Sequence, residues 1–450
     1  MLELKKRFRR GSLPLLAACL ATGAAAAAPL PPRPADDLVA AVADPRLRDL
    51  LDEVLERNPE IARMRAKAAA AATRAPQVRS LPDPMATLNL FVLPPETRVG
   101  PQRVGVSVSQ RVPWLGKLRL GEQAAVYEAA AAEAEVEAVR LRLVTAVRSR
   151  FHELAFQTAW AALLREEQEL LNQHEEISRA RYAAGQGLQQ GVIKVQAEIT
   201  RTETRELEVE SRRRSLLAEL NALRDRPADR EIEVSALPPP EAPRLDLAVL
   251  REQAGRRRPE LAGVRAEIAR AEVLVELARL AFKPDLTVGL GYTLVERRQD
   301  AAGRLDPPSG NGDDILALSV GANLPVRKRR LEAGVEEALH TRAVAEGSLR
   351  QLAAEIESTV GDAAARLPLL LRQWQLFEDV LYVQAEEALR STEAAYVTGK
   401  LNALDLVDAE HVLFDVRTSS ARAQADIAIL RARLEGALGI CLPALEEPES

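Results

Sequence analysis

The chain has 450 residues, of which 47% are apolar, 28% are charged and only 3% are aromatic. A composition dominated by Ala, Leu, Arg and Glu favours long helices over a β-sandwich or an α/β enzyme. Basic and acidic residues number 61 and 66 and are mixed along the chain, which argues against a basic face for nucleic acid. Two cysteines and four scattered histidines cannot form a disulfide framework or a Cys-based metal site, and no nucleophile–base set or phosphate loop is visible. The sequence therefore predicts neither an enzyme nor a bound cofactor.

The N-terminus has the pattern of an export signal. Five basic residues lie between positions 5 and 10, and the apolar run Leu13 to Ala28 follows them. This pattern predicts a signal peptide over 1–28. The stretch Leu16-Ala17-Ala18-Cys19 also fits a bacterial lipoprotein cleavage box, which would end the signal at 18 and place a lipid on Cys19. Both alternatives stay open, and either one predicts an exported protein.

The chain contains the same sequence pattern twice. Asn58-Pro59-Glu60 recurs as Arg258-Pro259-Glu260 at an offset of 200, and Pro82-Asp83 recurs as Pro284-Asp285 at an offset of 202. Pro113 and Lys117 recur as Pro325 and Arg329 at an offset of 212. The offset changes mainly between positions 84 and 113, as a loop between packed elements would allow. We predict a Pro-rich linker at 29–44, a first repeat at 45–224, a second Pro-rich linker in an equatorial region at 225–245, a second repeat at 246–440 and a tail at 441–450.

The residue pattern of each repeat predicts long helices. In the first repeat they run over 59–81, 117–184 and 189–224. In the second repeat, apolar residues from Leu349 to Leu381 follow alternating spacings of three and four, which is a coiled-coil pattern. Pro368 lies inside that pattern and is predicted to kink or break the helix. A helix of roughly 68 residues is about 100 Å long, so the helices must pack side by side as a bundle or tube.

Four short segments alternate apolar residues with small or polar ones, at 87–92, 104–109, 286–294 and 316–324. A single such segment also fits a half-buried strand of a soluble sheet. Four of them between very long helices, in an exported chain, favour two β-hairpins of a membrane barrel. Four strands cannot close a barrel, so two copies would supply eight strands and three copies twelve. The small residues on the second face favour the wider barrel, with the loops at 94–103 and 296–314 outside.

The order helix, β-hairpin, long helix, tip and helix, present twice over 45–440, resembles the TolC-type outer-membrane efflux protein family. Three motifs carry the resemblance: Tyr182-Ala183-Ala184-Gly185 with Tyr396-Val397-Thr398-Gly399, Leu404-Asp405-Leu406-Val407-Asp408-Ala409, and Gln110-Arg111-Val112-Pro113-Trp114-Leu115-Gly116-Lys117. The third is similar to a signature common in the heavy-metal efflux branch.

The resemblance implies a mainly α fold with membrane β-structure. In such a fold, a homotrimer forms a twelve-stranded β-barrel in the outer membrane of a Gram-negative bacterium, continued by an α-helical barrel in the periplasm. It also implies a passive exit duct in a tripartite efflux system. Its partners would be outer-membrane lipid, a periplasmic adaptor and an inner-membrane pump of the resistance-nodulation-division (RND) type. A heavy-metal cation is one substrate class that the branch suggests.

The resemblance also assigns roles to individual residues. Asp405 and Asp408 share a helical face, and in a trimer each would form a ring of carboxylates at the periplasmic entrance. The tip turns and the adaptor-docking surface are predicted at Tyr182, Gly185, Gly187, Gly191, Tyr396 and Gly399. Gly191 and Leu401 stand where the family's archetype has an acid and an arginine. The resemblance therefore does not predict which contacts hold this entrance closed. His411, near the tip, is predicted to be structural.

A second group of residues is expected at the membrane surface. Lys117 and the run Arg327, Lys328, Arg329 and Arg330 follow the last strand of each hairpin, where their side chains would reach lipid phosphates. Trp114 is expected in the interfacial aromatic belt.

Two other functions remain compatible with the sequence. A type I protein secretion duct has the same architecture and a different pump. A soluble periplasmic coiled-coil scaffold or adaptor also uses long helical hairpins, but it would lack the two hairpins of membrane-type strands. The sequence names neither the substrate nor the pump.

Overall fold

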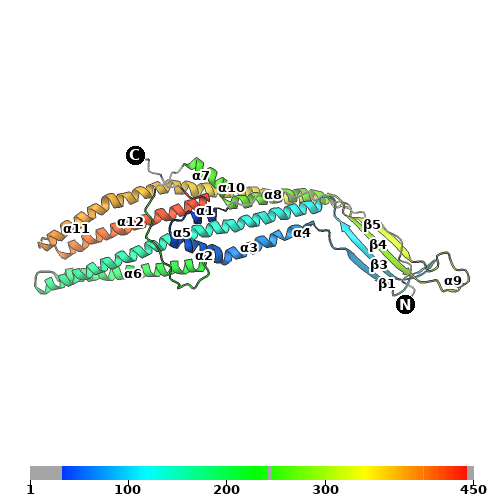
Figure 1. Ribbon diagram of the computed structural model, residues 1–450, viewed down its shortest axis with the longest axis horizontal. Coiled ribbons are helices and arrows are strands. Elements are labelled where there is room, and N and C mark those ends of the chain that lie inside the picture. Colours follow the sequence, from blue (N-terminus) through cyan, green and yellow to red (C-terminus); the bar gives the residue numbers. More distant parts are fainter. Residues whose placement is uncertain (1–32, 242–245, 399, 443–450) are drawn as a thin grey trace.

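The computed structural model describes residues 33–241, 246–398 and 400–442, so the predicted signal peptide, the lipidation site Cys19 and the tip residue Gly399 lie outside the described residues. The described chain is a long rod, with a β-sheet at one end and two helical hairpin tips at the other (Figure 1). Within the described residues, no helix combines the length and apolar character needed to cross a membrane.

The two repeats contain a similar succession of elements, with an additional short strand in the first hairpin and a short helix in the loop of the second. The first repeat and the segment before it comprise α1 (Pro34–Ala40), α2 (Pro45–Arg57), α3 (Pro59–Ala72), α4 (Arg74–Arg79), β1 (Met85–Leu90), β2 (Glu96–Thr97), β3 (Gly100–Val112), α5 (Lys117–Ala183) and α6 (Gln189–Leu223). The second repeat comprises α7 (Leu247–Arg257), α8 (Pro259–Arg279), the 3-10 turn η1 (Leu280–Phe282), β4 (Leu286–Val295), α9 (Ala301–Leu305), β5 (Ile315–Ala322), α10 (Lys328–Leu376), the π-turn η2 (Phe377–Leu381), α11 (Tyr382–Val397) and α12 (Ala403–Leu438).

The long helices agree with the sequence predictions to within one residue at each end of α5 and α6. The predicted helix over 59–81 instead forms two helices that meet at Thr73. Pro76 explains the division, because it has no N–H to donate to the carbonyl of Ala72.

The prediction of a break at Pro368 is wrong. Helix α10 continues through Pro368, and the departure from α-helical geometry is the π-turn nine residues later. Pro368 is exposed, so water can satisfy the carbonyl of Ala364 that loses its helical partner.

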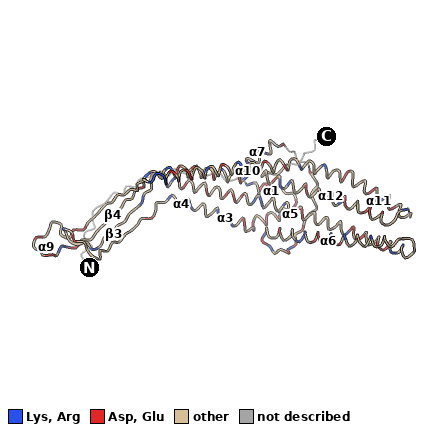
Figure 2. The backbone as a smooth tube through the Cα atoms, turned by 180° about the vertical axis from the view of Figure 1, so that it is seen from behind, with Lys and Arg blue, Asp and Glu red and all other residues tan. Residues whose placement is uncertain are grey.

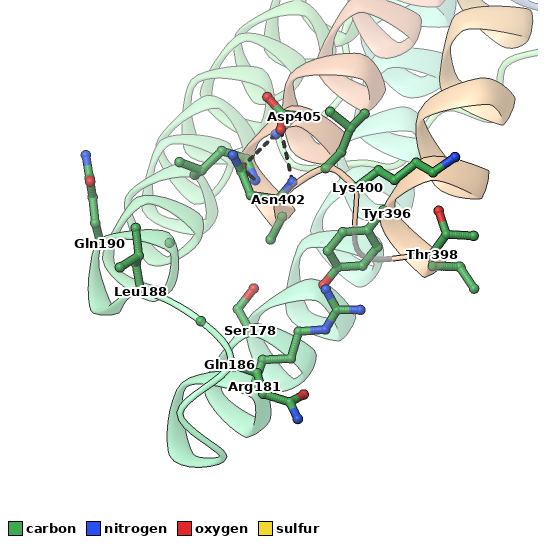
Figure 3. Close-up of a pocket in the computed structure, with 16 residues that line it drawn as sticks. Ser178, Arg181, Gln186, Leu188, Gln190, Tyr396, Thr398, Lys400, Asn402 and Asp405 are labelled. Atoms are coloured by element: carbon green, nitrogen blue, oxygen red, sulfur yellow. Dashed lines mark hydrogen bonds between the residues drawn. The ribbon is translucent and has the colours of Figure 1, made fainter.

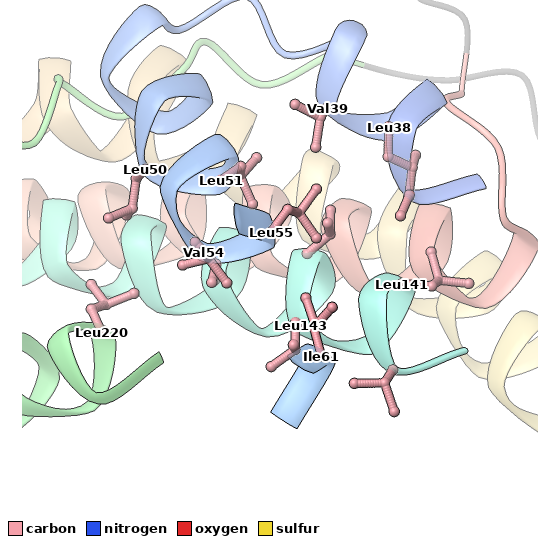
Figure 4. Packing of buried hydrophobic residues seen from close by; sticks show 14 of the residues in the cluster. Leu38, Val39, Leu50, Leu51, Val54, Leu55, Ile61, Leu141, Leu143 and Leu220 are labelled. Atoms are coloured by element: carbon pink, nitrogen blue, oxygen red, sulfur yellow. The ribbon is translucent and has the colours of Figure 1, made fainter. Parts of the chain in front are cut away.

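Two large apolar clusters hold the middle of the rod. In the first, α2 packs its buried face onto α5, in a cluster that also includes residues of α3 and α6 (Figure 4); it contains the fully buried Leu51, Val54, Val144 and Leu220. In the second, the predicted coiled-coil stripe of α10 packs on α12 through Ile356, Val360, Ala363 and Leu367. The predicted apolar stripe is therefore confirmed for the packing of α10 against α12.

In both repeats, the residue before a helix binds the last carbonyls of another helix, so that the two helices lie end to end. The side chain of Asn58, which caps α3, donates from Nδ2 to the carbonyl of Leu223 at the end of α6, at 2.6 Å. Arg258, at the equivalent position before α8, donates to the carbonyls of Gly436 and Ala437 at the end of α12, at 3.1 and 3.3 Å. Each pair of shorter helices therefore reaches about the length of one long helix.

The strands form one antiparallel sheet in the order β1–β3–β4–β5, with the short β2 paired to the outer end of β3. Both predicted hairpins are confirmed, and their registers agree with the repeat offsets. Met85 lies opposite Ser109 in the first hairpin, and shifting these positions by 202 and 212 gives Thr287 and Gly321, which lie opposite each other in the second.

The two faces of the sheet differ in chemistry. One cross-strand row on the first face is Leu88, Val106, Tyr292 and Leu316, all of them 45–71% exposed. The neighbouring row on the second face is Thr87, Ser107, Gly291 and Ala317. The first face is therefore an apolar surface that nothing in the described chain covers.

Candidate functional site

The first helical tip is a tight turn between α5 and α6. Gly185 has φ +71°, a backbone conformation that residues with a side chain rarely adopt. The N–H of Gly185 donates to the carbonyl of Tyr182 at 3.0 Å, and the N–H of Gln186 donates to that of Arg181 at 2.9 Å. These bonds satisfy the last carbonyls of α5, so Gly185 is required by the turn itself.

The second tip is fixed by a capping box at the start of α12. The side chain of Asn402 accepts from the N–H groups of Leu404 and Asp405, and the carboxylate of Asp405 accepts from the N–H of Asn402 at 3.0 Å. Asp405 is therefore half-buried and engaged in the cap, whereas Asp408 is exposed. The Asn-x-x-Asp spacing signalled this cap, which the sequence analysis missed.

A cavity of about 760 Å³ lies between the two tips (Figure 3). The guanidinium carbon of Arg181, on α5, lies 4.1 Å from the ring centre of Tyr396, on α11. Gly187 and Gly191 line this cavity from the first tip. Tyr396 is 5% exposed and Tyr182 is 47% exposed, so the two repeat-equivalent tyrosines have different environments.

Large apolar side chains are exposed at the tips. Leu188 and Ile193 follow the first turn, and Val397 precedes the second; they are 77%, 55% and 79% exposed. Exposed apolar side chains gathered at one end of a soluble helical bundle are typical of a surface that a partner covers.

A second candidate region is the junction between the sheet and the helices. Asp285, just before β4, is buried and accepts hydrogen bonds from Lys117 Nζ, from a terminal nitrogen of Arg111 and from the N–H of Trp114, at 2.7, 2.7 and 2.9 Å. Burial alone would raise its pKa, but the bond from Lys117 and those from Trp114 and Arg111 hold the pKa of Asp285 at about 2. Lys117, predicted to reach lipid phosphates, instead points inward to this carboxylate.

The other predicted interface residues are arranged differently. Arg327, Lys328, Arg329 and Arg330 are exposed, and none has a carboxylate within 4 Å in the part of the chain that the structure describes. Figure 2 shows the cluster of Lys and Arg at this junction. Trp114, whose N–H binds Asp285 at the same junction, is 36% exposed. Helix α10 thus begins with cations, although the helix dipole favours acids at this end.

No metal site emerges from the side chains that the structure describes: they contain no group of three or more His, Cys, Asp or Glu placed to hold an ion. His411, predicted to be structural, lies 3.2 Å from Glu167 and 3.7 Å from Asp415. The contact of His411 with Glu167, and that of His174 with Glu410, could not be found from the sequence, because each joins residues more than 230 positions apart.

Comparisons with known proteins place these features in context. Residues 250–440 match the family model described as outer membrane efflux protein. No curated protein matches the chain. Among solved structures, the chain is similar to the outer-membrane channel OprN, with a TM-score of 0.73, 16% identity and coverage of 88% of this chain and 90% of that one.

Two further structures have similar scores. CusC, described as forming a transmembrane channel, gives a TM-score of 0.72 at 17% identity, covering 88% of this chain and 93% of that one. The outer membrane protein VceC from Vibrio cholerae gives 0.72 at 23% identity, covering 88% and 96%. The chain therefore has the fold of outer-membrane channels, and its second repeat matches the outer membrane efflux protein family.

Proposed function

We propose that this protein is the outer-membrane exit duct of a tripartite efflux system, assembled as a homotrimer with a twelve-stranded barrel. The observation that carries the proposal is the sheet: its apolar face is exposed across all four strands, and within the described residues no strand pairs with the outer edges of β1 and β5. An apolar face of this kind fits lipid, and free strand edges are costly inside a bilayer. Further copies of the chain would remove those edges.

The internal repeat specifies how the edges would meet. Within one chain, β3 of the first repeat pairs with β4 of the second, and Val108 lies opposite Leu290. Shifting Val108 by 212 gives Val320 on β5, and shifting Leu290 back by 202 gives Leu88 on β1. If the subunit contact repeats the contact between repeats, Val320 lies opposite Leu88 of the partner subunit. Both are exposed and lie on the apolar face, as this pairing requires.

A disulfide test follows from this register. In a Cys441→Ser background, the double variant Val320→Cys with Leu88→Cys should give covalent trimers on oxidation, resolved on a non-reducing gel. The two positions are on opposite edges of one sheet, so they cannot cross-link within a chain. The matched control is Val320→Cys with Asn89→Cys, because neighbouring residues of a strand point to opposite faces. Equal cross-linking of both variants would contradict the register.

Conductance across a planar bilayer tests the channel function itself. The trimer is expected to conduct ions, whereas a soluble periplasmic scaffold would stay monomeric in detergent and conduct none. A type I secretion duct would conduct as well. It is distinguished by whether loss of the protein from its host blocks export of a protein or raises sensitivity to small toxic compounds.

We further propose that the tips dock the periplasmic adaptor of an RND-type pump. The exposed apolar side chains at the tips and the open cavity between them support this role. Asp408, exposed near the second tip, would then contribute an acidic ring at the entrance. The basic run 327–330 and Trp114 would face the headgroups of outer-membrane lipid.

Bulk added at the tips should disturb docking without disturbing the fold. A Cβ added at Gly191 would meet no atom within 4 Å beyond the backbone of its own helix, so space for a larger side chain begins there. Gly191→Leu should therefore leave the melting temperature unchanged while lowering efflux at least several-fold, measured as drug or metal sensitivity of the host. Gly185→Asn is the milder control, because asparagine tolerates the left-handed conformation of the turn. Normal efflux by Gly191→Leu would remove this surface from the docking site.

The heavy-metal substrate class has less support than the channel. The octapeptide at 110–117 suggested that branch, but Arg111 and Lys117 bind Asp285, and Gln110 donates to the carbonyl of Pro82 at 2.7 Å. These contacts explain the motif as a brace between sheet and helices. The likeness to outer-membrane structures, at TM-scores of 0.72 to 0.73, concerns the fold and names no substrate.

A further inference from the structure

Two histidine–glutamate pairs connect the hairpin α5–α6 with the hairpin α11–α12. His174 on α5 lies 2.6 Å from Glu410 on α12, measured from Nε2 to Oε1. One residue further along α12, His411 lies 3.2 Å from Glu167 on α5, measured from Nδ1 to Oε1. Each helix thus contributes one acid and one histidine to the same crossing.

The first pair is shielded from solvent, and in the second pair the histidine is partly exposed. The side chains of His174 and Glu410 are 13% and 7% exposed, and those of His411 and Glu167 are 35% and 8% exposed. The Nδ1 atom of His174 is buried without a hydrogen-bond partner. Glu410 is therefore the group that interacts with the His174 imidazole.

Other charged groups around the crossing are few in the described chain. Helix α6 contributes Arg205, 4.0 Å from Glu167, and α12 contributes Asp415, 3.7 Å from the Nε2 atom of His411. On α5 itself, Glu175 is bound to Arg179 and Gln196, and Glu166 is bound to Arg417 of α12. Both imidazoles therefore face carboxylates across the crossing.

The apolar contact between the hairpins at this level is small. Leu171, Val195 and Val407 form a cluster of three buried residues, whereas the two clusters in the middle of the rod contain 25 and 13. A region with so little buried apolar surface is where a protein opens most easily. The polar pairs consequently make up a large share of what holds the two hairpins together here.

We propose that His174 and His411 form a proton-sensitive latch that holds the two hairpins of a subunit together near the entrance, so that acid favours the closed form. Histidine is the side chain that changes charge between pH 5 and 8, while carboxylates remain ionised over that range. Protonation turns each hydrogen bond between a neutral imidazole and a carboxylate into a bond between two opposite charges, which is stronger. The latch rests on the proposed channel function, because its effect is on opening.

The chain contains its own controls, since it has four histidines in all. His340 is exposed and has no carboxylate within 4 Å in the described chain. Burial, together with Arg148, lowers the pKa of His152 to about 4, so this residue stays neutral at the pH values used in the test. Of the four histidines, His174 and His411 are therefore the two that lie against a carboxylate of the other hairpin.

The test is the single-channel open probability of the full-length protein in planar bilayers, at pH 8 and pH 5.5. The wild type should open about tenfold less often at pH 5.5, if each protonated pair strengthens its contact roughly threefold. The double variant His174→Gln with His411→Gln should lose this response, and His340→Gln should keep it. Glu410→Gln, which retains both histidines, should lose about half of it.

The outcomes separate the latch from the channel. Absence of conductance at every pH would contradict the proposed function. A wild type that conducts equally at both pH values, or a double variant that keeps the full response, would overturn the latch and leave the channel standing. If the double variant does not assemble, Glu410→Gln provides the deciding measurement, and a full response in that variant overturns the latch.

Discussion

Replacing Asp285 with asparagine should destabilise the folded chain by about 2–3 kcal/mol at pH 7, which is the value of a pKa lowered from 3.8 to about 2. The carboxylate is buried and holds Lys117, Arg111 and the N–H of Trp114, so its loss leaves a half-buried ammonium without its counter-charge. The measurement is the urea-induced unfolding of the purified protein. Because the pKa in the folded state is lowered, this contribution is present above pH 3.8 and disappears as the pH falls through 2.

Asp83 provides the matched control for this variant. It occupies the equivalent position in the first repeat, but it is exposed and has no ion pair in the described chain. In the single subunit before assembly, Asp83→Asn should change stability by less than about 0.5 kcal/mol. If Asp285→Asn and Asp83→Asn lower the free energy of unfolding equally, the hydrogen bonds and ion pairs of Asp285 do not stabilise the fold.

In the trimer, the Asp83→Asn variant tests a predicted contact between subunits. Lys117, the partner of Asp285, corresponds to Arg329 in the second repeat. The repeat shift that places Val320 opposite Leu88 of the partner subunit therefore places Arg329 beside the partner's Asp83. A loss of trimer stability in Asp83→Asn, together with an unchanged monomer, is the expected result of that pairing.

Local features of the fold could be predicted from the sequence because short-range patterns encode them. The ends of α5 and α6 follow from turn residues and the loss of apolar periodicity, and the faces of the four strands follow from alternation. The repeat offsets even agree with the registers of both hairpins, because insertions in the loops leave the pairing of the strands unchanged.

Contacts between distant elements could not be predicted in the same way. Asp285 and Asp83 both follow a proline at equivalent positions of the two repeats, and only the packing of β3 against β4 brings Lys117 to one of them. The pairs of His174 and His411 depend on the rotation of α12 about its own axis, which no local pattern specifies. Tyr182 and Tyr396 likewise share a motif and differ in burial, because the hairpin α11–α12 lies against Arg181.

His152→Leu is expected to remove a pH-dependent loss of stability of about 3 kcal/mol. Burial, assisted by Arg148, lowers the pKa of His152 from 6.5 to about 4 in the folded protein, against the opposing effect of Asp44 and Glu435. Between pH 6.5 and 4 the unfolded chain therefore takes up a proton that the folded chain excludes. Stability must fall as the pH drops through this range, and this group has no effect above it.

The measurement is the difference in unfolding free energy between variant and wild type at pH 7.5 and at pH 4. Other groups titrate in both proteins and cancel in this difference, so His152→Leu should gain about 3 kcal/mol relative to wild type on acidification. In the control His340→Leu, at an exposed position, the unfolding free energy should change with pH as it does in the wild type. If the unfolding free energies of wild type and His152→Leu change equally between the two pH values, the imidazole is protonated inside the folded bundle. The region around Asp44 and Glu435 would then have to accommodate a charged histidine.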